Sequence, residues 1–273
     1  MTMQYQKMIG LFAWGLVVGC GAPRDAAHPT VRPARPAMYQ YSVMESLLAG
    51  VYDGDLTVGG VKQHGDFGLG TFDRLDGEMI VQDGVVYRVR GDGSVHVAAD
   101  GDRTPNAFVT WFQPTDTFAL QGGASLHDLQ AELARRLRPN RSYAIEVRGR
   151  FQAVSARAPE PATPPYPELA AQLAAHQHVF ALANTSGTAV GFLLPAYLGR
   201  VSVPGLHLHY LAADHASGGH VLDFQATPGT TVRIMELGGL DIEFSTNPAY
   251  DAADLTRDRQ RELQRAEAPG GKP

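Results

Sequence analysis

Cysteine is almost absent from this chain of 273 residues, which contains a single one, Cys20. One cysteine excludes an intramolecular disulfide and leaves no cysteine ligand for a metal in the folded part of the chain. Clusters of basic residues are missing as well. The formal net charge is −5, and the arginines between positions 135 and 141 are typical of the solvated end of a helix. We therefore expect no nucleic-acid partner.

A complete phosphate-binding loop is also lacking. The segment Gly65–Phe72 is rich in glycine, but it does not complete the pattern Gly-x-Gly-x-x-Gly, and no Lys-Ser or Lys-Thr pair follows it. Its glycines instead predict close packing of backbones or an unusual turn.

The longest apolar run near the N-terminus, Met8–Val18, is too short to span a bilayer as a permanent helix. Because Lys7 precedes it, the run is typical of the core of a signal peptide. The following Val17-Val18-Gly19-Cys20 resembles the lipobox of bacterial lipoproteins. We therefore expect residues 1–19 to be a lipoprotein-type signal peptide and Cys20 to be lipidated. A plain secretory signal or an uncleaved anchor is the alternative.

Residues 20–37 contain many prolines and alanines without a periodic apolar pattern, which predicts a tether. Gly21 rather than aspartate follows Cys20, and this favours sorting to the outer membrane. We expect an exported lipoprotein on the periplasmic side of the outer membrane or on the cell surface. Its contact with the membrane would be the lipid anchor at Cys20.

The composition is that of a soluble globular protein rich in strands and turns, with 44% hydrophobic and 19% charged residues, 30 glycines and 18 prolines. We predict an α+β fold with mixed, largely antiparallel β-sheets and a few helices. Residues 38–273 would form the folded domain. The proline-rich segment Pro159–Pro167 suggests two subdomains, about 38–158 and 159–273.

Local signals place several elements. Capping-box patterns at Ser42 and Ser125 predict helices over Val43–Ala49 and Ser125–Leu137, and Gln82-Asp83-Gly84 predicts a tight hairpin. Further helices are predicted at Pro167–His176 and in the tail Asp254–Glu267. Strands are predicted at Val95–Ala98, Ala107–Gln113, Tyr143–Val154, Val179–Ala183, Ala189–Leu194, Leu206–Tyr210, Val221–Gln225, Thr230–Glu236 and Asp241–Phe244.

Three histidines have the spacing of a metal site built on a hairpin. His207 and His209 share one face of a predicted strand because side chains alternate with a period of two. A polar turn follows, and the return strand can bring His220 alongside them. Three neutral imidazoles with one open position suit a catalytic zinc, although imidazole also binds copper, iron and nickel. His215 lies in the predicted turn, where we expect it to be solvated.

The alternative is that these are ordinary histidines in a strand pair, since His-x-His also occurs by chance. A second pair, His176 and His178, follows a predicted helix, where residues two apart do not share a face. We do not expect this second pair to bind metal.

Four segments closely resemble the α-acetolactate decarboxylase family: Tyr41–Val58, His64–Ile80, Gly205–His209 and Gly218–Phe224. The resemblance runs from about residue 39 to 245. It implies zinc-dependent decarboxylation of 2-acetolactate to acetoin and CO2, by way of a metal-stabilised enediolate. Residues 38–273 would then be the catalytic domain.

The resemblance also implies roles for individual residues. It places the zinc ligands on His207, His209 and His220. It places an active-site glutamate on Glu78, an arginine on Arg157, a threonine that binds substrate on Thr71, and a second glutamate on Glu267 in the tail, where Glu262 is close by. A guanidinium can hold the departing carboxylate, and a buried carboxylic acid can protonate the enediolate. The residues alone do not decide between Glu78 and Glu267 as the proton donor.

Two alternatives remain open at this point. One is a lipoprotein that binds zinc or another ligand without catalysis. The other is a lyase on the same scaffold that acts on a related 2-hydroxy-3-oxo acid. A homodimer is an assembly compatible with each of these hypotheses.

Overall fold

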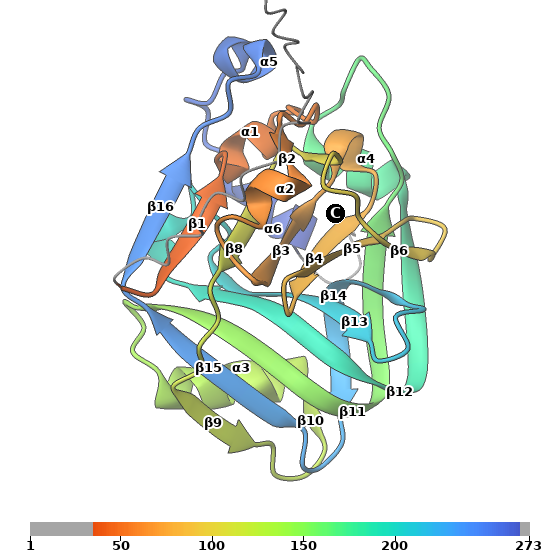
Figure 1. The fold of residues 1–273 in the computed structure, drawn as a ribbon, viewed down its shortest axis with the longest axis vertical. Helices are drawn as coiled ribbons and strands as arrows, with labels where there is room; N and C mark the ends of the chain where they lie inside the picture. Colours follow the sequence, from red (N-terminus) through yellow and green to blue (C-terminus); the bar gives the residue numbers. More distant parts are fainter. Residues whose placement is uncertain (1–34, 268–273) are drawn as a thin grey trace, which may run out of the picture. The chain divides into compact units, whose positions relative to one another are not determined.

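The computed structural model describes residues 35–267. The predicted signal peptide, Cys20 and the tether up to residue 34 lie outside the described residues. Among residues 35–267, no helix is long and apolar enough to cross a membrane. The described part is an α+β structure, as predicted, and it has two seven-stranded sheets and short helices (Figure 1). The predicted division into subdomains stays a prediction.

The first sheet has the strand order β16-β1-β8-β3-β4-β5-β6. Its strands are β1 (Ala37–Tyr41), β3 (Phe67–Thr71), β4 (Glu78–Gln82), β5 (Val85–Val89), β6 (Val95–Val97), β8 (Ala107–Thr110) and β16 (Gly239–Glu243). All neighbours are antiparallel except β1 and β16, which are parallel. The sheet is therefore mixed but largely antiparallel.

The second sheet has the order β10-β14-β13-β12-β11-β15-β9. Its strands are β9 (Asp116–Ala119), β10 (Ala124–Ser125), β11 (Ser142–Pro159), β12 (Gln177–Leu194), β13 (Gly205–Ala212), β14 (Gly218–Ala226) and β15 (Thr231–Leu237). Because β14 also pairs with β11, the four strands from β11 to β14 form a closed ring. A separate ladder joins β2 (Leu56–Thr57) to β7 (Arg103–Thr104).

The helices are all short. They are α1 (Met44–Leu48), α2 (Val58–Val61), α3 (Leu126–Arg136), α4 (Leu169–Ala175), α5 (Pro248–Ala252) and α6 (Gln260–Glu267), with 3-10 turns η1 (Asp73–Leu75) and η2 (Ala196–Leu198). Helices α1, α4 and α6 share one apolar cluster, to which Leu48, Leu173 and Leu263 contribute.

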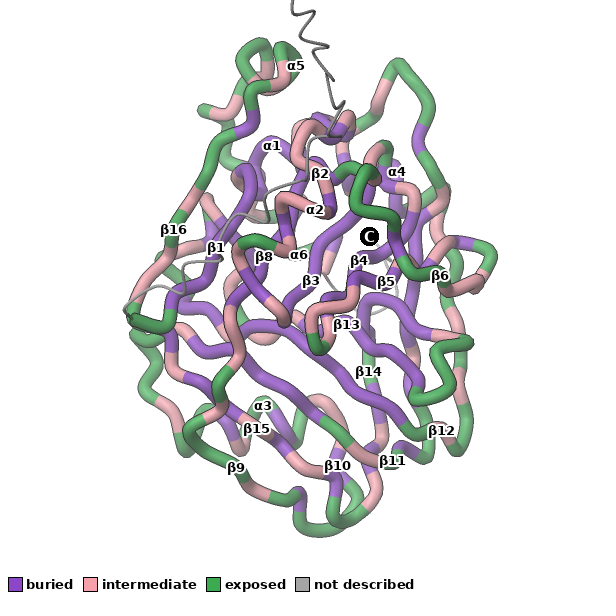
Figure 2. Tube along the Cα trace, viewed as in Figure 1, coloured by how far each residue is buried: buried purple, intermediate pink, exposed green. Residues whose placement is uncertain are grey.

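One core cluster lies between the two sheets. It joins residues of the first sheet, such as Leu69 and Ile80, to residues of the second, such as Val190 and Phe192. Figure 2 shows this as continuous purple along β3, β4 and β8 and along the inner parts of β11 and β12. Burial of these side chains stabilises the fold by roughly 1.5–3 kcal/mol for each large apolar residue.

Two sequence-based predictions in the first sheet are confirmed. Asp83 and Gly84 both have positive φ, 51° and 78°, and join β4 to β5 in a tight hairpin. Glycine in Gly65–Phe72 permits close packing of strands. A Cβ on Gly68 would lie 2.0 Å from the carbonyl oxygen of Phe108 on β8, so only glycine fits there.

Several strands of the second sheet are longer than predicted. Two separate strands were expected within residues 179–194, but β12 runs unbroken from Gln177 to Leu194. It pairs with β11 along nearly its whole length, and Gly149 lies opposite Gly187. The ladder therefore continues across Gly149 without a break.

The two predicted capping boxes have different outcomes. Ser125 and Asp128 form one at the start of α3. At α1 the prediction is wrong, since Val43 is the N-cap and makes no side-chain cap bond. Ser42 instead has a φ of 61°, its backbone N–H donates to the carbonyl oxygen of Glu243, and its hydroxyl bonds Ser46. The tertiary contact with β16 replaces the local cap.

Candidate active site

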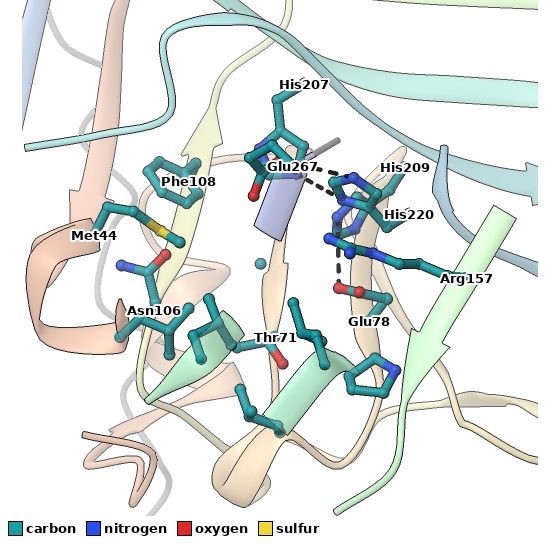
Figure 3. Close-up of a pocket in the computed structure, with 16 residues that line it drawn as sticks. Met44, Thr71, Glu78, Asn106, Phe108, Arg157, His207, His209, His220 and Glu267 are labelled. Carbon is teal, nitrogen blue, oxygen red and sulfur yellow. Dashed lines mark hydrogen bonds and ion pairs between the residues drawn. The ribbon is translucent and has the colours of Figure 1, made fainter. Parts of the chain in front are cut away.

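The hairpin of β13 and β14 brings the three predicted histidines together. His209 lies directly opposite His220 in the ladder, and His207 shares the face of His209. One ligand atom from each of the three lies within 4.8 Å of the others, and they are the one such group of three among residues 35–267. Figure 3 shows the three rings turned toward one another.

The geometry and protonation of this cluster fit a metal ion. Nε2 of His207 lies 3.1 Å from Nδ1 of His220. This distance is close to the roughly 3.3 Å that separates two ligand atoms on one tetrahedral zinc ion. His209 donates from Nδ1 to the carbonyl oxygen of Met79 at 2.8 Å, which leaves its Nε2 free to act as a ligand. All three imidazoles therefore present a nitrogen toward a common point.

Burial keeps the imidazoles neutral. It lowers the pKa of His207 to about 3, and the nearby positive charge of Arg157 adds to this effect. Burial also lowers the pKa of His209 and His220 well below the ordinary value, with Arg157 contributing to both. Neutral imidazole is the form that binds a metal, so the site needs no deprotonation at neutral pH.

Glu78 reaches the histidines from the first residue of β4. Its Oε2 lies 3.5 Å from Nε2 of His209, and its residue is 8% exposed. Burial raises the pKa of Glu78 to about 8, although Arg157 lowers it and Glu267 raises it further. A carboxyl with this pKa is largely protonated at neutral pH, and it can donate a proton.

Glu267 reaches the same place from the last residue of α6. Its Oε2 lies 3.8 Å from Nε2 of His207 and 3.7 Å from Nε2 of His220. Burial raises the pKa of Glu267 to about 7, and Arg157 opposes this rise. Glu262, which the sequence left as a neighbouring candidate, pairs with Arg257. Glu267 is thus the tail glutamate that reaches the histidines.

Arg157 enters from β11, where the ladder places it opposite His220 on β14. It is 3% exposed. Its Nη1 donates to Oε1 of Gln177 at 3.3 Å, whereas its buried Nε has no hydrogen-bond partner among the described residues. A buried guanidinium with an unused donor is suited to bind a carboxylate in two-point fashion.

The remaining wall of the cavity is mostly apolar. The cavity measures about 50 Å³, which admits a small molecule or a few waters. Figure 3 shows Met44, Asn106 and Phe108 on the side away from Arg157 and Glu78. Thr71 also lines it, but its hydroxyl donates to the carbonyl oxygen of Gly77 at 2.9 Å. Only the lone pairs of this hydroxyl remain available to a ligand.

All seven predicted residues of the site therefore lie around one cavity. Two polar residues here were not predicted. Gln177 accepts a hydrogen bond from Arg157, and Asn106 lines the cavity and donates from its side-chain amide to the carbonyl oxygen of Tyr41. No spacing pattern marks either residue. His178 is outside the site and pairs with Glu160.

The site combines three buried imidazoles with two carboxyl groups of raised pKa and a guanidinium. This combination defines an enzyme active site. A structural metal centre would instead close its coordination shell with protein ligands. A model of the alpha-acetolactate decarboxylase family matches residues 38–257. The fold and the site thus point to one family of carboxy-lyases.

Known relatives and structures agree with this family match. The alpha-acetolactate decarboxylase of Methanosarcina mazei is 39% identical over 86% of this chain and 81% of its own length. That of Bacillus subtilis is 38% identical over 80% and 85%. The crystal structure of the Bacillus subtilis protein superposes with a TM-score of 0.82 at 35% identity, over 85% of this chain and 99% of that one. The chain belongs to the α-acetolactate decarboxylase family.

Proposed function

We propose that this protein converts 2-acetolactate to acetoin and CO2 with a zinc ion bound at His207, His209 and His220. One observation carries the proposal, which is that three imidazoles, a guanidinium and two carboxyl groups line the same small cavity. The relatives named alpha-acetolactate decarboxylase support the reaction. Zinc is inferred from the three-imidazole donor set.

When bound, zinc would act as a Lewis acid toward the ketone and hydroxyl oxygens of the substrate. Arg157 would hold the substrate carboxylate through two N–H groups, including the Nε that has no partner among the described residues. Breaking the bond to the carboxylate carbon converts this anion to neutral CO2. The attraction to the guanidinium is then lost, which favours release of the product.

The departing CO2 leaves an enediolate that must be protonated at the carbon that carried the carboxylate. Glu78 and Glu267 both lie beside the histidines, and burial raises their pKa values to about 8 and about 7. Either carboxyl can therefore hold a proton at neutral pH and deliver it to this carbon. The second carboxyl, when it is ionised, can take up the hydroxyl proton of the substrate and return it to the same oxygen after the carbon is protonated, so that acetoin leaves with its hydroxyl group.

The apolar part of the cavity would contact the small alkyl groups of the substrate. Met44 and Phe108 lie opposite Arg157, so a molecule held by its carboxylate would direct its methyl groups toward them. A related acid with a longer alkyl chain would displace these side chains. We therefore expect 2-acetolactate to be preferred over its ethyl homologue.

The test is acetoin formation from racemic 2-acetolactate by residues 21–273, loaded with zinc and compared with the chelated protein. His207→Ala should abolish turnover, whereas His215→Ala should not, because His215 is exposed in the turn between β13 and β14. Zinc bound without any turnover would support the non-catalytic alternative. Turnover of other 2-hydroxy-3-oxo acids alone would support a different lyase.

A further inference from the structure

The helix that carries Glu267 needs an anchor. α6 has eight residues, and an isolated helix of that length is not stable in water because nucleation is unfavourable. Leu263 and Ala266 pack against the apolar cluster of α1 and α4. They hold one face of α6, but the position of Glu267 also depends on what fixes the start of the helix.

Arg259 stands directly before α6 and is 5% exposed. A cation is unfavourable at a helix N-terminus because the helix dipole is positive there. Arg259 must therefore be placed for another reason. Its Nη1 donates to the carbonyl oxygen of Asp254 at 2.8 Å and lies 3.6 Å from Oε2 of Glu45. Its Nε lies 3.5 Å from Oε2 of Glu262 and 3.9 Å from Oε1 of Glu168.

Two further arginines complete a balanced cluster. Arg257 lies 2.8 Å from Glu168 and 3.0 Å from Glu262. Arg200 lies 3.9 Å from Glu45 and donates to the carbonyl oxygens of Leu255 and Thr256. We call this set the ionic latch. Its members are Glu45, Glu168, Arg200, Arg257, Arg259 and Glu262.

The latch connects the three helices that border the active-site cavity. Glu45 is on α1, next to Met44, which lines the cavity. Glu168 is the N-cap of α4, next to Leu169, which also lines it. Glu262 is on α6, the helix that ends at Glu267.

We propose that the ionic latch, with Arg259 at its centre, positions Glu267 in the active site by holding α6 against α1 and α4. Arg259 is a positioning residue in this scheme, because it touches neither the cavity nor the histidines. The inference rests on the proposed function, in which Glu267 takes part in proton transfer. It adds residues that lie beyond the range 38–257 matched by the family model.

Burial makes the latch sensitive to loss of one member. Glu45 is 3% exposed, and both of its carboxylate oxygens lack a hydrogen-bond partner among the described residues. Its charge therefore depends on Arg259 and Arg200. Without Arg259, an unpaired carboxylate would remain buried between α1 and α6, which is strongly unfavourable unless the helices part or water enters.

The experiment compares Arg259→Met with the parent in two backgrounds, the wild-type chain and Glu267→Gln. We expect Arg259→Met to lower kcat by roughly tenfold to a hundredfold with a smaller change in KM, since displacement of a catalytic group by about 1 Å has effects of this size. In the Glu267→Gln background the same substitution should lower kcat by less than about threefold, because the group it positions is already inactive. Arg259→Lys should restore part of the loss.

Hydrogen–deuterium exchange supplies a readout that does not depend on turnover. Backbone amides of residues 260–267 should exchange about tenfold faster in Arg259→Met. The control is Arg261→Met, at an exposed position on the same helix, which should change neither exchange nor kcat. If Arg259→Met does not fold, Glu45→Gln with Arg259→Met removes both buried charges, and the lost attraction between α1 and α6 must still speed exchange in residues 260–267.

Equal losses of kcat in the two backgrounds would overturn the proposal, as would unchanged exchange in residues 260–267. Failure of the proposed function gives a different pattern. In that case the wild-type chain forms no acetoin, and the exchange comparison alone decides whether the latch holds α6.

Discussion

Replacing Arg157 by lysine separates the charge of this residue from its geometry. The side chain is 3% exposed and fixed by Gln177. Lysine retains the positive charge but cannot present two parallel N–H groups to a carboxylate. One hydrogen bond to a charged group contributes about 1.5–3 kcal/mol. Loss of one should therefore lower kcat/KM for 2-acetolactate by roughly tenfold to 150-fold.

The assay is steady-state acetoin formation, with the zinc content measured on the same samples. Arg150→Lys is the matched control, because Arg150 lies on the same strand but is exposed. It should leave kcat/KM unchanged. If Arg157→Lys has normal kinetics with full zinc content, two-point binding of the substrate carboxylate by Arg157 is refuted.

The charge itself is tested by Arg157→Met. Arg157 lowers the pKa of both Glu78 and Glu267, so its removal should raise both values. A proton donor with a higher pKa stays protonated to higher pH. The fall of kcat on the alkaline side of its pH profile should therefore shift to higher pH. Arg157→Lys should not show this shift. Identical profiles for the two variants would contradict the assigned electrostatic role.

Three other predictions concern the metal-free site, the cap of α3 and the predicted signal peptide. The metal-free protein should lose thermal stability as the pH falls below about 6.5. The reason is that histidines of the unfolded chain are protonated there, whereas burial keeps folded His207 neutral down to a pH of about 3. A melting temperature that stays constant from pH 7 to 5 would contradict this. Ser125→Ala should destabilise the protein by about 1 kcal/mol through loss of the cap, without changing kcat; chemical denaturation measures it, and an unchanged midpoint would argue against the cap. Cys20→Ala should move the protein from the membrane to the soluble fraction of cells; identical fractionation of both forms would exclude lipidation.

Several elements of the fold could be predicted because their signals are local. The Asp83-Gly84 turn and the Ser125 cap act within a few residues, and both are present. The same local rule failed at Ser42, where the chain bonds Glu243 of β16 and Glu45 is drawn toward Arg259. Pairing between distant segments also joined two predicted strands into β12. Such contacts leave no periodic trace in the sequence.

The three-histidine cluster could be predicted from the residues alone, because the period of a strand puts His207 and His209 on one face and a short return strand brings in His220. Glu78, Arg157 and Glu267 were expected there from the family resemblance alone. Their arrival beside the histidines depends on how β4, β11 and α6 pack in three dimensions. This packing also decides the protonation of the site, since the raised pKa values of the glutamates and the lowered ones of the histidines come from burial. Burial depends on what packs around a group in space, and neighbours along the chain do not specify it.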